Sequence, residues 1–210
     1  MSYAVKEMFL TLQGEGMQAG RRAVFLRFAG CNLWSGREAD RAAADCTFCD
    51  TDFVGTDGVN GGRYDAEALA AKVDEVWETG ERKLAVVTGG EPLLQLDGAL
   101  IGALRARGFE VAVESNGTLP APAGIDWLCV SPKAGTDIVQ RSGDELKLVW
   151  PQPAIDPAEL RLWDFDHFLI QPMDGADARA ALDQSIAFSS GVARPSSSIT
   201  SFTTTTSNVK

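Results

Sequence analysis

The sequence lacks clusters of positive charge and long apolar runs. It has 19 Lys and Arg against 29 Asp and Glu, a formal net charge of −10, and no basic run longer than Arg21-Arg22. Nucleic acids and anionic membranes bind basic surfaces, so we expect neither as a partner. No apolar run approaches the ~20 residues that cross a bilayer. The first ten residues include Lys6 and Glu7 and have no apolar signal core, so we expect a cytoplasmic protein.

Cysteine and histidine are also scarce, with four and one among 210 residues. A chain of this length with 45% hydrophobic residues can bury a core without disulfides, and a reducing compartment disfavours them. Three of the cysteines, Cys31, Cys46 and Cys49, are spaced C-x14-C-x2-C. Cys129 lies far away in an apolar run, and we expect it to be a buried bystander.

Three thiolates on one loop predict a metallocluster with a ligand missing. A cubane [4Fe-4S] cluster normally takes four thiolates, so three would leave one iron open to bind and reduce a ligand. Structural zinc sites are closed, and a Cys3His site would need His167, which opens a predicted strand much further along the chain. The spacing favours an iron–sulfur cluster over zinc, and zinc over unligated thiols.

Short apolar runs alternate with helical patterns. Asp65 is positioned to cap a helix whose apolar residues recur every three or four positions up to Trp77, and a second helix is predicted over Asp97–Arg107. Apolar strands are predicted at Ala23–Phe28, Leu84–Val87, Glu110–Glu114, Trp127–Val130, Glu145–Val149 and His167–Ile170. This alternation predicts an α/β fold with a parallel sheet covered by helices.

Polar clusters directly follow four of these strands. They are Thr88-Gly-Gly-Glu-Pro92, Ser115-Asn-Gly117, Ser131-Pro-Lys133 and Gln171-Pro-Met-Asp174. Each alone would pass as an ordinary turn. Ligands bind at the carboxyl ends of parallel strands, so the four together predict a binding site at that edge. Glycines at 89 and 90 would let the backbone approach a ligand closely.

The last segment has a different composition. From Ser189 to Lys210, 12 of 22 residues are Ser or Thr, with no helical or strand period. Such low complexity is typical of poorly packed chain. We expect one folded domain over residues 1–184 and an atypical Ser/Thr-rich C-terminal tail over residues 185–210.

The cysteine loop and Thr88–Pro92 resemble the radical S-adenosylmethionine enzymes, whose usual spacing is C-x3-C-x2-C. The long insertion after the first cysteine makes the chain more closely similar to the 7-carboxy-7-deazaguanine synthase family. Further matches are Leu12-Gln-Gly-Glu-Gly16, Arg27–Ser35, Cys49–Asp52, Glu114–Gly117 and Gln171–Asp174. The resemblance covers about residues 1–180. The family's usual ending, with a tryptophan, a histidine–lysine pair and an apolar tail, has no match here.

This resemblance implies a partial (β/α) barrel, a homodimer and a radical ring contraction. The substrate would be 6-carboxy-5,6,7,8-tetrahydropterin, converted to 7-carboxy-7-deazaguanine with release of ammonia, on the way to queuosine and other deazapurines. The implied cofactors are a [4Fe-4S] cluster, S-adenosylmethionine and Mg²⁺. S-adenosylmethionine would be regenerated, and a reductant such as flavodoxin or ferredoxin would supply electrons.

The resemblance also assigns site residues. Cys31, Cys46 and Cys49 would hold the cluster and Thr51 the magnesium ion. Substrate would contact Leu12, Gln13, Gly14, Arg27 and Thr88. S-adenosylmethionine would contact Phe48, Cys49, Asp50, Gly90, Ser131, Pro132, Lys133, Gln171, Pro172, Met173 and Asp174.

Side-chain chemistry supports some of these roles. The fork of Arg27 suits the substrate carboxylate, although it could equally form a structural ion pair. The hydroxyl of Thr51 suits a hard cation that keeps most of its waters. Glu114 and Asn116 offer the donors and acceptors that would read a pterin edge, although Glu114 could instead cap the following loop.

Two other functions remain open. A glycyl-radical-activating enzyme would also be a small radical S-adenosylmethionine protein, but it would need a segment that docks a protein partner. A non-catalytic cluster or zinc protein would explain the cysteines and leave the four strand-end clusters without a role.

Overall fold

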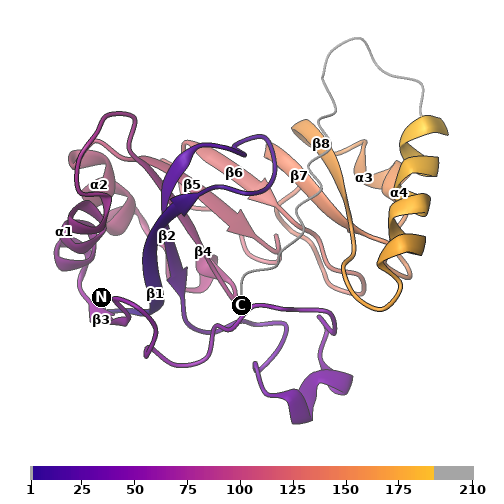
Figure 1. Ribbon diagram of the computed structural model, residues 1–210, viewed down its shortest axis with the longest axis horizontal. Coiled ribbons are helices and arrows are strands. Elements are labelled where there is room, and N and C mark those ends of the chain that lie inside the picture. Colours follow the sequence, from indigo (N-terminus) through magenta and orange to yellow (C-terminus); the bar gives the residue numbers. More distant parts are fainter. Residues whose placement is uncertain (1, 192–210) are drawn as a thin grey trace.

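The computed structural model describes residues 2–191, which form one eight-stranded sheet with helices packed against it (Figure 1). The strands are β1 Tyr3–Leu12, β2 Arg22–Phe28, β3 Gly62–Tyr64, β4 Leu84–Gly89, β5 Glu110–Ser115, β6 Trp127–Val130, β7 Ser142–Trp150 and β8 Asp164–Pro172. The helices are α1 Ala66–Trp77, α2 Gly98–Ala106, α3 Pro157–Leu160 and α4 Ala178–Gly191, with 3-10 turns η1 Glu38–Ala43 and η2 Pro92–Leu94.

The sheet order is β3-β1-β2-β4-β5-β6-β7-β8, and neighbouring strands from β2 to β8 run parallel. The predicted α/β class is therefore confirmed. Two antiparallel strands, β1 and β3, extend the β2 edge and were not expected. The pattern of β1 is hard to read because Lys6 and Glu7 interrupt its apolar residues at a register shift. Lys6 is nevertheless buried and forms ion pairs with Asp52 and Asp57.

The cap predicted for α1 is present, and α2 has a cap that was not predicted. The carboxylate of Asp65 accepts a hydrogen bond from the backbone N–H of Ala68, and Asp97 accepts from the first turn of α2. Such caps contribute about 1 kcal/mol each. The apolar stripes of α1 and α2 bury Leu69, Val73, Trp77, Leu100 and Leu104 against β1, β2, β4 and β5 in the main core.

Because side chains alternate along each strand, every second residue points to the opposite face of the sheet. This face has an apolar part and a polar part. Toward the amino ends of the parallel strands it is apolar, with a small cluster of Ala23, Leu84, Val86 and Ala112 beside Phe25 and Trp127. Toward the carboxyl ends, the same alternation brings Arg27, Thr88, Glu114, Lys147 and Gln171 onto this face. Polar chemistry is thus concentrated at the predicted edge.

The boundary expected between residues 184 and 185 is wrong as a structural boundary, because α4 runs through it. Ser185 is buried, and its Oγ donates to the carbonyl of Ala181 over 2.8 Å. This bond within the helix satisfies the hydroxyl, so a Ser-rich segment can continue the helix. The Ser/Thr-rich sequence after Gly191 lies outside the described residues.

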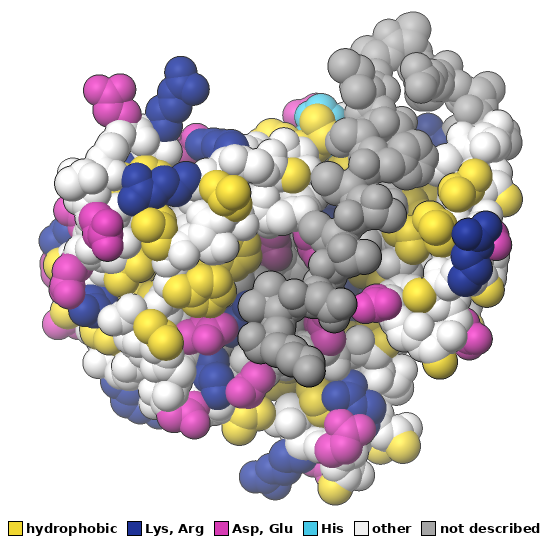
Figure 2. Space-filling view, viewed as in Figure 1, with side chains coloured by type: hydrophobic (Ala, Val, Ile, Leu, Met, Phe, Trp, Pro, Cys, Tyr) yellow, Lys and Arg dark blue, Asp and Glu magenta, His cyan; other side chains and the backbone are white. Residues whose placement is uncertain are grey.

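The charged side chains of the described residues are mixed on the surface. On the face seen in Figure 2, Lys and Arg side chains are scattered among acidic ones and do not form a patch. No helix within residues 2–191 is long and apolar enough to cross a membrane.

Candidate active site

The three cysteines of the loop after β2 are free thiols. The neighbouring Cys46 thiol lowers the pKa of Cys49 to about 6, and Cys49 in turn raises the pKa of Cys46. Burial raises the pKa of Cys31, whose sulfur accepts from the N–H of Leu33. Thiolates are the donors that iron–sulfur clusters require, so this donor set fits such a cluster.

His167 does not join the cysteine loop in a Cys3His zinc site. Among residues 2–191, no three His, Cys, Asp or Glu side chains are arranged to hold a single metal ion. The ring of His167 on β8 instead stacks on Trp127, with centroids 5.7 Å apart. A Cys3His site is therefore not formed in the described part of the chain.

Gly90 is in close contact with the base of the cysteine loop. A Cβ at position 90 would lie 2.2 Å from the carbonyl oxygen of Gly30 and 2.7 Å from the Cβ of Cys31. The next N–H, that of Glu91, donates to the same Gly30 carbonyl over 3.0 Å. The glycine thus has a structural role in addition to the cofactor contact expected from sequence.

The side chain of Glu91 joins the ends of β4 and β5. It is fully buried and accepts hydrogen bonds from Ser115 Oγ at 2.9 Å, the N–H of Asn116 at 2.8 Å and the N–H of Leu93 at 2.9 Å. Burial raises the pKa of Glu91, and these donors offset part of that rise. Glu91 lies in the motif that follows β4, but no role was predicted for it.

The amide of Asn116 is occupied by protein contacts. Its Nδ2 donates to Asn32 Oδ1 over 3.0 Å, and its Oδ1 accepts from the N–H and hydroxyl of Thr118. Asn116 therefore ties the strand end to the cysteine loop. A pterin contact would have to displace these bonds, so the structure favours a supporting role over the expected direct one.

The Ser131–Lys133 segment also meets the cysteine loop. Lys133 Nζ donates to the carbonyl and hydroxyl of Ser131 at 2.7 and 2.8 Å and lies 5.8 Å from the centre of the Phe48 ring. Pro132 is buried, and its carbonyl accepts from Gln152. Desolvation lowers the pKa of Lys133, although the neighbouring cysteines favour its charge. Phe48, Ser131 and Lys133, which the resemblance assigns to S-adenosylmethionine, are thus brought together.

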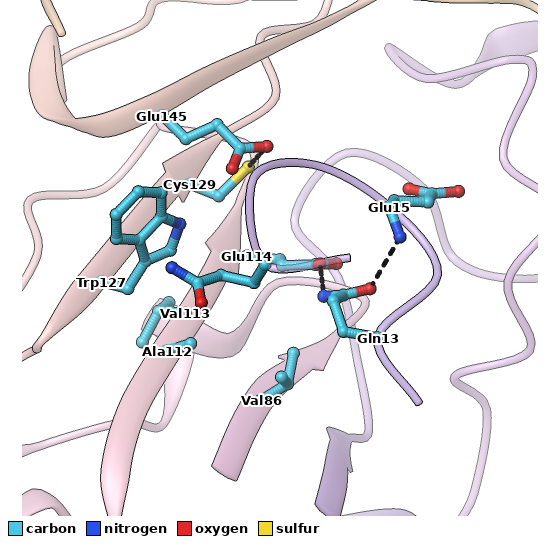
Figure 3. A pocket seen from close by; sticks show the side chains of 10 residues that line it. Gln13, Glu15, Val86, Ala112, Val113, Glu114, Trp127, Cys129 and Glu145 are labelled. Carbon is cyan, nitrogen blue, oxygen red and sulfur yellow. Dashed lines mark hydrogen bonds between the residues drawn. The ribbon is translucent and has the colours of Figure 1, made fainter. Parts of the chain in front are cut away.

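The loop between β1 and β2, residues 13–21, folds over the face of the sheet opposite α1 and α2, hereafter the inner face (Figure 3). Gln13 Nε2 donates to Glu114 Oε1 over 2.9 Å, and the N–H of Met17 donates to Glu145 Oε2 over 2.9 Å. A small cavity lies between this loop and Val86, Ala112, Val113, Trp127 and Cys129. The loop leaves β1 beside the start of β2, whereas the cysteine loop follows the end of β2. The two loops therefore approach the site from opposite ends of the parallel strands.

The tip of the same loop is tied to β7 and β8. Glu15 forms an ion pair with Lys147 at 2.8 Å and accepts from Gln171 Nε2 at 3.1 Å. Burial would lower the pKa of Lys147, but the carboxylates of Glu114 and Glu15 raise it well above its usual value. Sequence reasoning assigned no role to Glu15, Glu145 or Lys147. Glu145 and Lys147 alternate with leucines in a buried strand, and that alternation was the available signal.

Arg27 and Thr88 are paired across β2 and β4. Arg27 Nε donates to Glu7 Oε1 over 2.8 Å, so the structural ion pair considered from sequence is present. Within the described residues no hydrogen bond engages the two terminal nitrogens of Arg27. The ion pair therefore orients the guanidinium and leaves its fork for another anion.

Other assigned residues lie at the margins of the site. The side chain of Leu12 is 62% exposed, and Gly14 is exposed. Thr51 Oγ1 donates to the exposed Asp50 at 3.4 Å. After Gln171, Pro172 and Met173 are half-buried, Asp174 is exposed, and the N–H of Met173 donates to the carbonyl of Trp150 over 2.7 Å.

Comparison with known proteins shows the family of the chain. Residues 40–145 match the Radical SAM superfamily. The chain is 62% identical over 190 residues to a 7-carboxy-7-deazaguanine synthase of Caulobacter vibrioides, covering 90% of each chain. It is 61% identical over 183 residues to the enzyme of that name from Bordetella pertussis, covering 86% of this chain and 87% of the relative.

A solved structure has the same architecture. The crystal structure of QueE from Escherichia coli superposes with a TM-score of 0.66 and 27% identity, covering 90% of this chain and 92% of that chain. Radical S-adenosylmethionine enzymes use a [4Fe-4S] cluster and S-adenosylmethionine, which the thiols of the cysteine loop fit. This chain belongs to the 7-carboxy-7-deazaguanine synthase family of the radical S-adenosylmethionine superfamily.

Proposed function

We propose that this protein converts 6-carboxy-5,6,7,8-tetrahydropterin into 7-carboxy-7-deazaguanine with release of ammonia, in the biosynthesis of queuosine and related deazapurines. The observation that carries the proposal is the arrangement of two loops. The cysteine loop lies at the carboxyl ends of the strands, and residues 13–17 cover the inner face from the other end. In this proposal the substrate lies between them, with Arg27 and Thr88 beside it.

The cofactor is held by residues of several strand ends. Cys31, Cys46 and Cys49 bind the cluster, and the S-adenosylmethionine site is formed by Phe48–Asp50, Gly90, Ser131–Lys133 and Gln171–Asp174. When bound, the cluster and S-adenosylmethionine supply a carbon radical that abstracts hydrogen from the substrate. The protein must orient the substrate and exclude water. The buried Glu91 and Asn116 serve this purpose by fixing the cysteine loop to β5.

The substrate is oriented by charge and by hydrogen bonds. The two terminal nitrogens of Arg27, which no hydrogen bond within residues 2–191 engages, bind the carboxylate in two places, while Glu7 accepts from Nε. Gln13 and Glu114, already bonded to each other, present donors and acceptors to the amide and amine edge of the pterin. Leu12 and Gly14 contribute backbone contacts, since the Leu12 side chain is exposed.

Further parts of the proposal concern magnesium, assembly and electrons. Thr51 binds Mg²⁺ together with the substrate, which supplies most of the opposing charge. The protein works as a cytoplasmic homodimer, reduced by a small electron carrier such as flavodoxin or ferredoxin. The family resemblance supports each of these assignments.

The test is anaerobic reconstitution with iron and sulfide, followed by turnover with the pterin, S-adenosylmethionine, Mg²⁺ and a reductant. We expect an iron–sulfur absorbance that changes when S-adenosylmethionine is added, and 7-carboxy-7-deazaguanine in excess over 5′-deoxyadenosine. Cys31→Ala is the negative control and Cys129→Ala the matched positive control. Cleavage of S-adenosylmethionine without a deazaguanine product would refute the proposed substrate and favour a glycyl-radical-activating enzyme. Retention of zinc in place of iron would refute both.

A further inference from the structure

Two residues without an assigned ligand contact, Glu15 and Lys147, lie between the proposed substrate loop and the proposed cofactor segment. Glu15 is next to Leu12–Gly14, and its N–H donates to Gln13 Oε1 over 3.1 Å. Its carboxylate meets Lys147, 132 residues away, and Gln171, 156 residues away. Any shift of Glu15 must therefore move a group on each side.

Lys147 is the buried, strand-borne member of this group of residues. Its side chain is 9% exposed and lies 2.8 Å from Glu15 and 3.8 Å from Glu114. It stands on β7, and the neighbouring strands β6 and β8 hold its backbone from both sides. An ammonium buried between two carboxylates holds both of them, and removing it would leave like charges close together.

The network reaches both proposed ligands through short bonds. On one side Glu114 accepts from Gln13, and both are proposed substrate contacts. On the other side Gln171, the first residue of the proposed cofactor segment, donates to Glu15. Within residues 2–191, Glu15 and Lys147 are the side chains whose polar contacts connect these two ends. They are well placed to transmit order from one ligand to the other.

We infer that Lys147, acting through Glu15, is a positioning residue that couples the pterin site to the S-adenosylmethionine site, so that each ligand strengthens binding of the other. The inference rests on the function proposed above. A ligand that restrains the side chain of Gln13 also restrains Glu15 in its ion pair with Lys147. Glu15 then holds the side chain of Gln171 in position for the second ligand. Because coupling between two binding sites is reciprocal, the same factor must appear in both orders of addition.

The experiment measures binding and not turnover. The dissociation constant of S-adenosylmethionine is determined by calorimetry on the anaerobically reconstituted protein, with and without 6-carboxypterin. This oxidised pterin is aromatic and has no hydrogen at C6 to lose. The variants are Glu15→Met, Lys147→Met and the double variant. Lys83→Met is the matched control, since it removes a 2.6 Å ion pair with Asp74 away from the site.

For the parent protein and Lys83→Met we expect 6-carboxypterin to tighten S-adenosylmethionine binding by at least about fivefold, the lower end of measured couplings. Either Met variant should reduce this factor to about one, and the double variant should be no worse than the single ones because the pair acts as a unit. A coupling factor within twofold of the parent in Glu15→Met would overturn the inference. This variant decides the matter if Lys147→Met does not fold, because Lys147 keeps Glu114 as its partner when Glu15 is removed.

Failure of the proposed function gives a different result. If the parent does not bind 6-carboxypterin at all, the substrate is wrong. The positioning role is then judged from S-adenosylmethionine alone, whose affinity should fall at least threefold in Glu15→Met because Gln171 loses its acceptor. An unchanged affinity would overturn the inference in that case also.

Discussion

The carboxylate of Glu91 accepts a hydrogen bond from the backbone N–H of Asn116 over 2.8 Å. This bond joins the ends of β4 and β5 through two residues that are 25 positions apart in the chain. All the groups around this carboxylate are donors, from Leu93, Ser115 and Asn116. Glu91 therefore acts as an acceptor that no neutral amide can replace, and the base of the cysteine loop depends on it.

We predict that Glu91→Gln destabilises the fold although it removes a buried charge. In either orientation, the new NH₂ group would face a backbone N–H, so one buried hydrogen bond is lost and two donors oppose each other. The cost should be roughly 2–3 kcal/mol, measured by urea unfolding. Iron content after reconstitution should fall as well. A variant as stable as the parent would show that Glu91 is not a structural acceptor.

Gly90→Ala should prevent normal docking of the cysteine loop, because the new Cβ would meet the backbone oxygen of Gly30. A backbone atom cannot move aside cheaply, so we expect reduced iron incorporation and a lower melting temperature. Gly102→Ala on α2 is the control, since nothing lies within 4 Å of its Cβ position. It should raise stability by up to about 1 kcal/mol. Equal effects of the two substitutions would contradict the docking role.

Arg27→Lys should impair turnover far more than folding. A point charge can keep the contact with Glu7 but cannot grip a carboxylate in two places. We expect a loss on the order of 1.5–3 kcal/mol of substrate interaction, which is roughly 10- to 100-fold in kcat/KM. Glu7→Gln, measured in parallel, should have a smaller effect. Unchanged kinetics with a lowered melting temperature would assign Arg27 to the structure alone.

The contribution of Glu15 to stability should depend on pH. Burial raises the pKa of Glu15, but Lys147 and Gln171 outweigh it and leave the pKa below its usual value. The stabilisation is therefore complete above the unfolded-state value of about 4.3 and disappears as pH falls through the lower folded-state pKa. In cluster-free protein, the stability difference between the parent and Glu15→Gln should shrink on acidification from pH 7. A difference independent of pH would mean that the ion pair does not stabilise the loop.

Cys129→Ala should leave the iron content intact, whereas Cys31→Ala should abolish it. The thiol of Cys129 is buried on β6 and donates weakly to Glu145 at 3.5 Å, so its loss should cost about 1 kcal/mol of stability. Iron analysis of both reconstituted variants provides the measurement. The opposite pattern would move Cys129 into the cluster site.

The sequence alone determined those features that depend on local pattern. Apolar residues at helical spacing behind Asp65 specified α1, because the period and the cap act within a few residues. Unbroken apolar runs such as Leu84–Val87 specified buried parallel strands, since only such strands hide both faces. The motifs after the strands indicated the active edge by themselves, because all parallel strands end on the same side.

The tertiary structure decided what depends on contacts between distant residues. The N-terminal strand carries Lys6 in its interior, and only partners near position 55 make that acceptable. Glu15 and Lys147 read separately as ordinary charged residues, and they become a pair only when the β1–β2 loop folds across the sheet. A charge is tolerated in a protein interior when an opposite charge meets it there. Sequence spacing does not encode that meeting, which is why no role was predicted for Glu15 and Lys147 from the sequence.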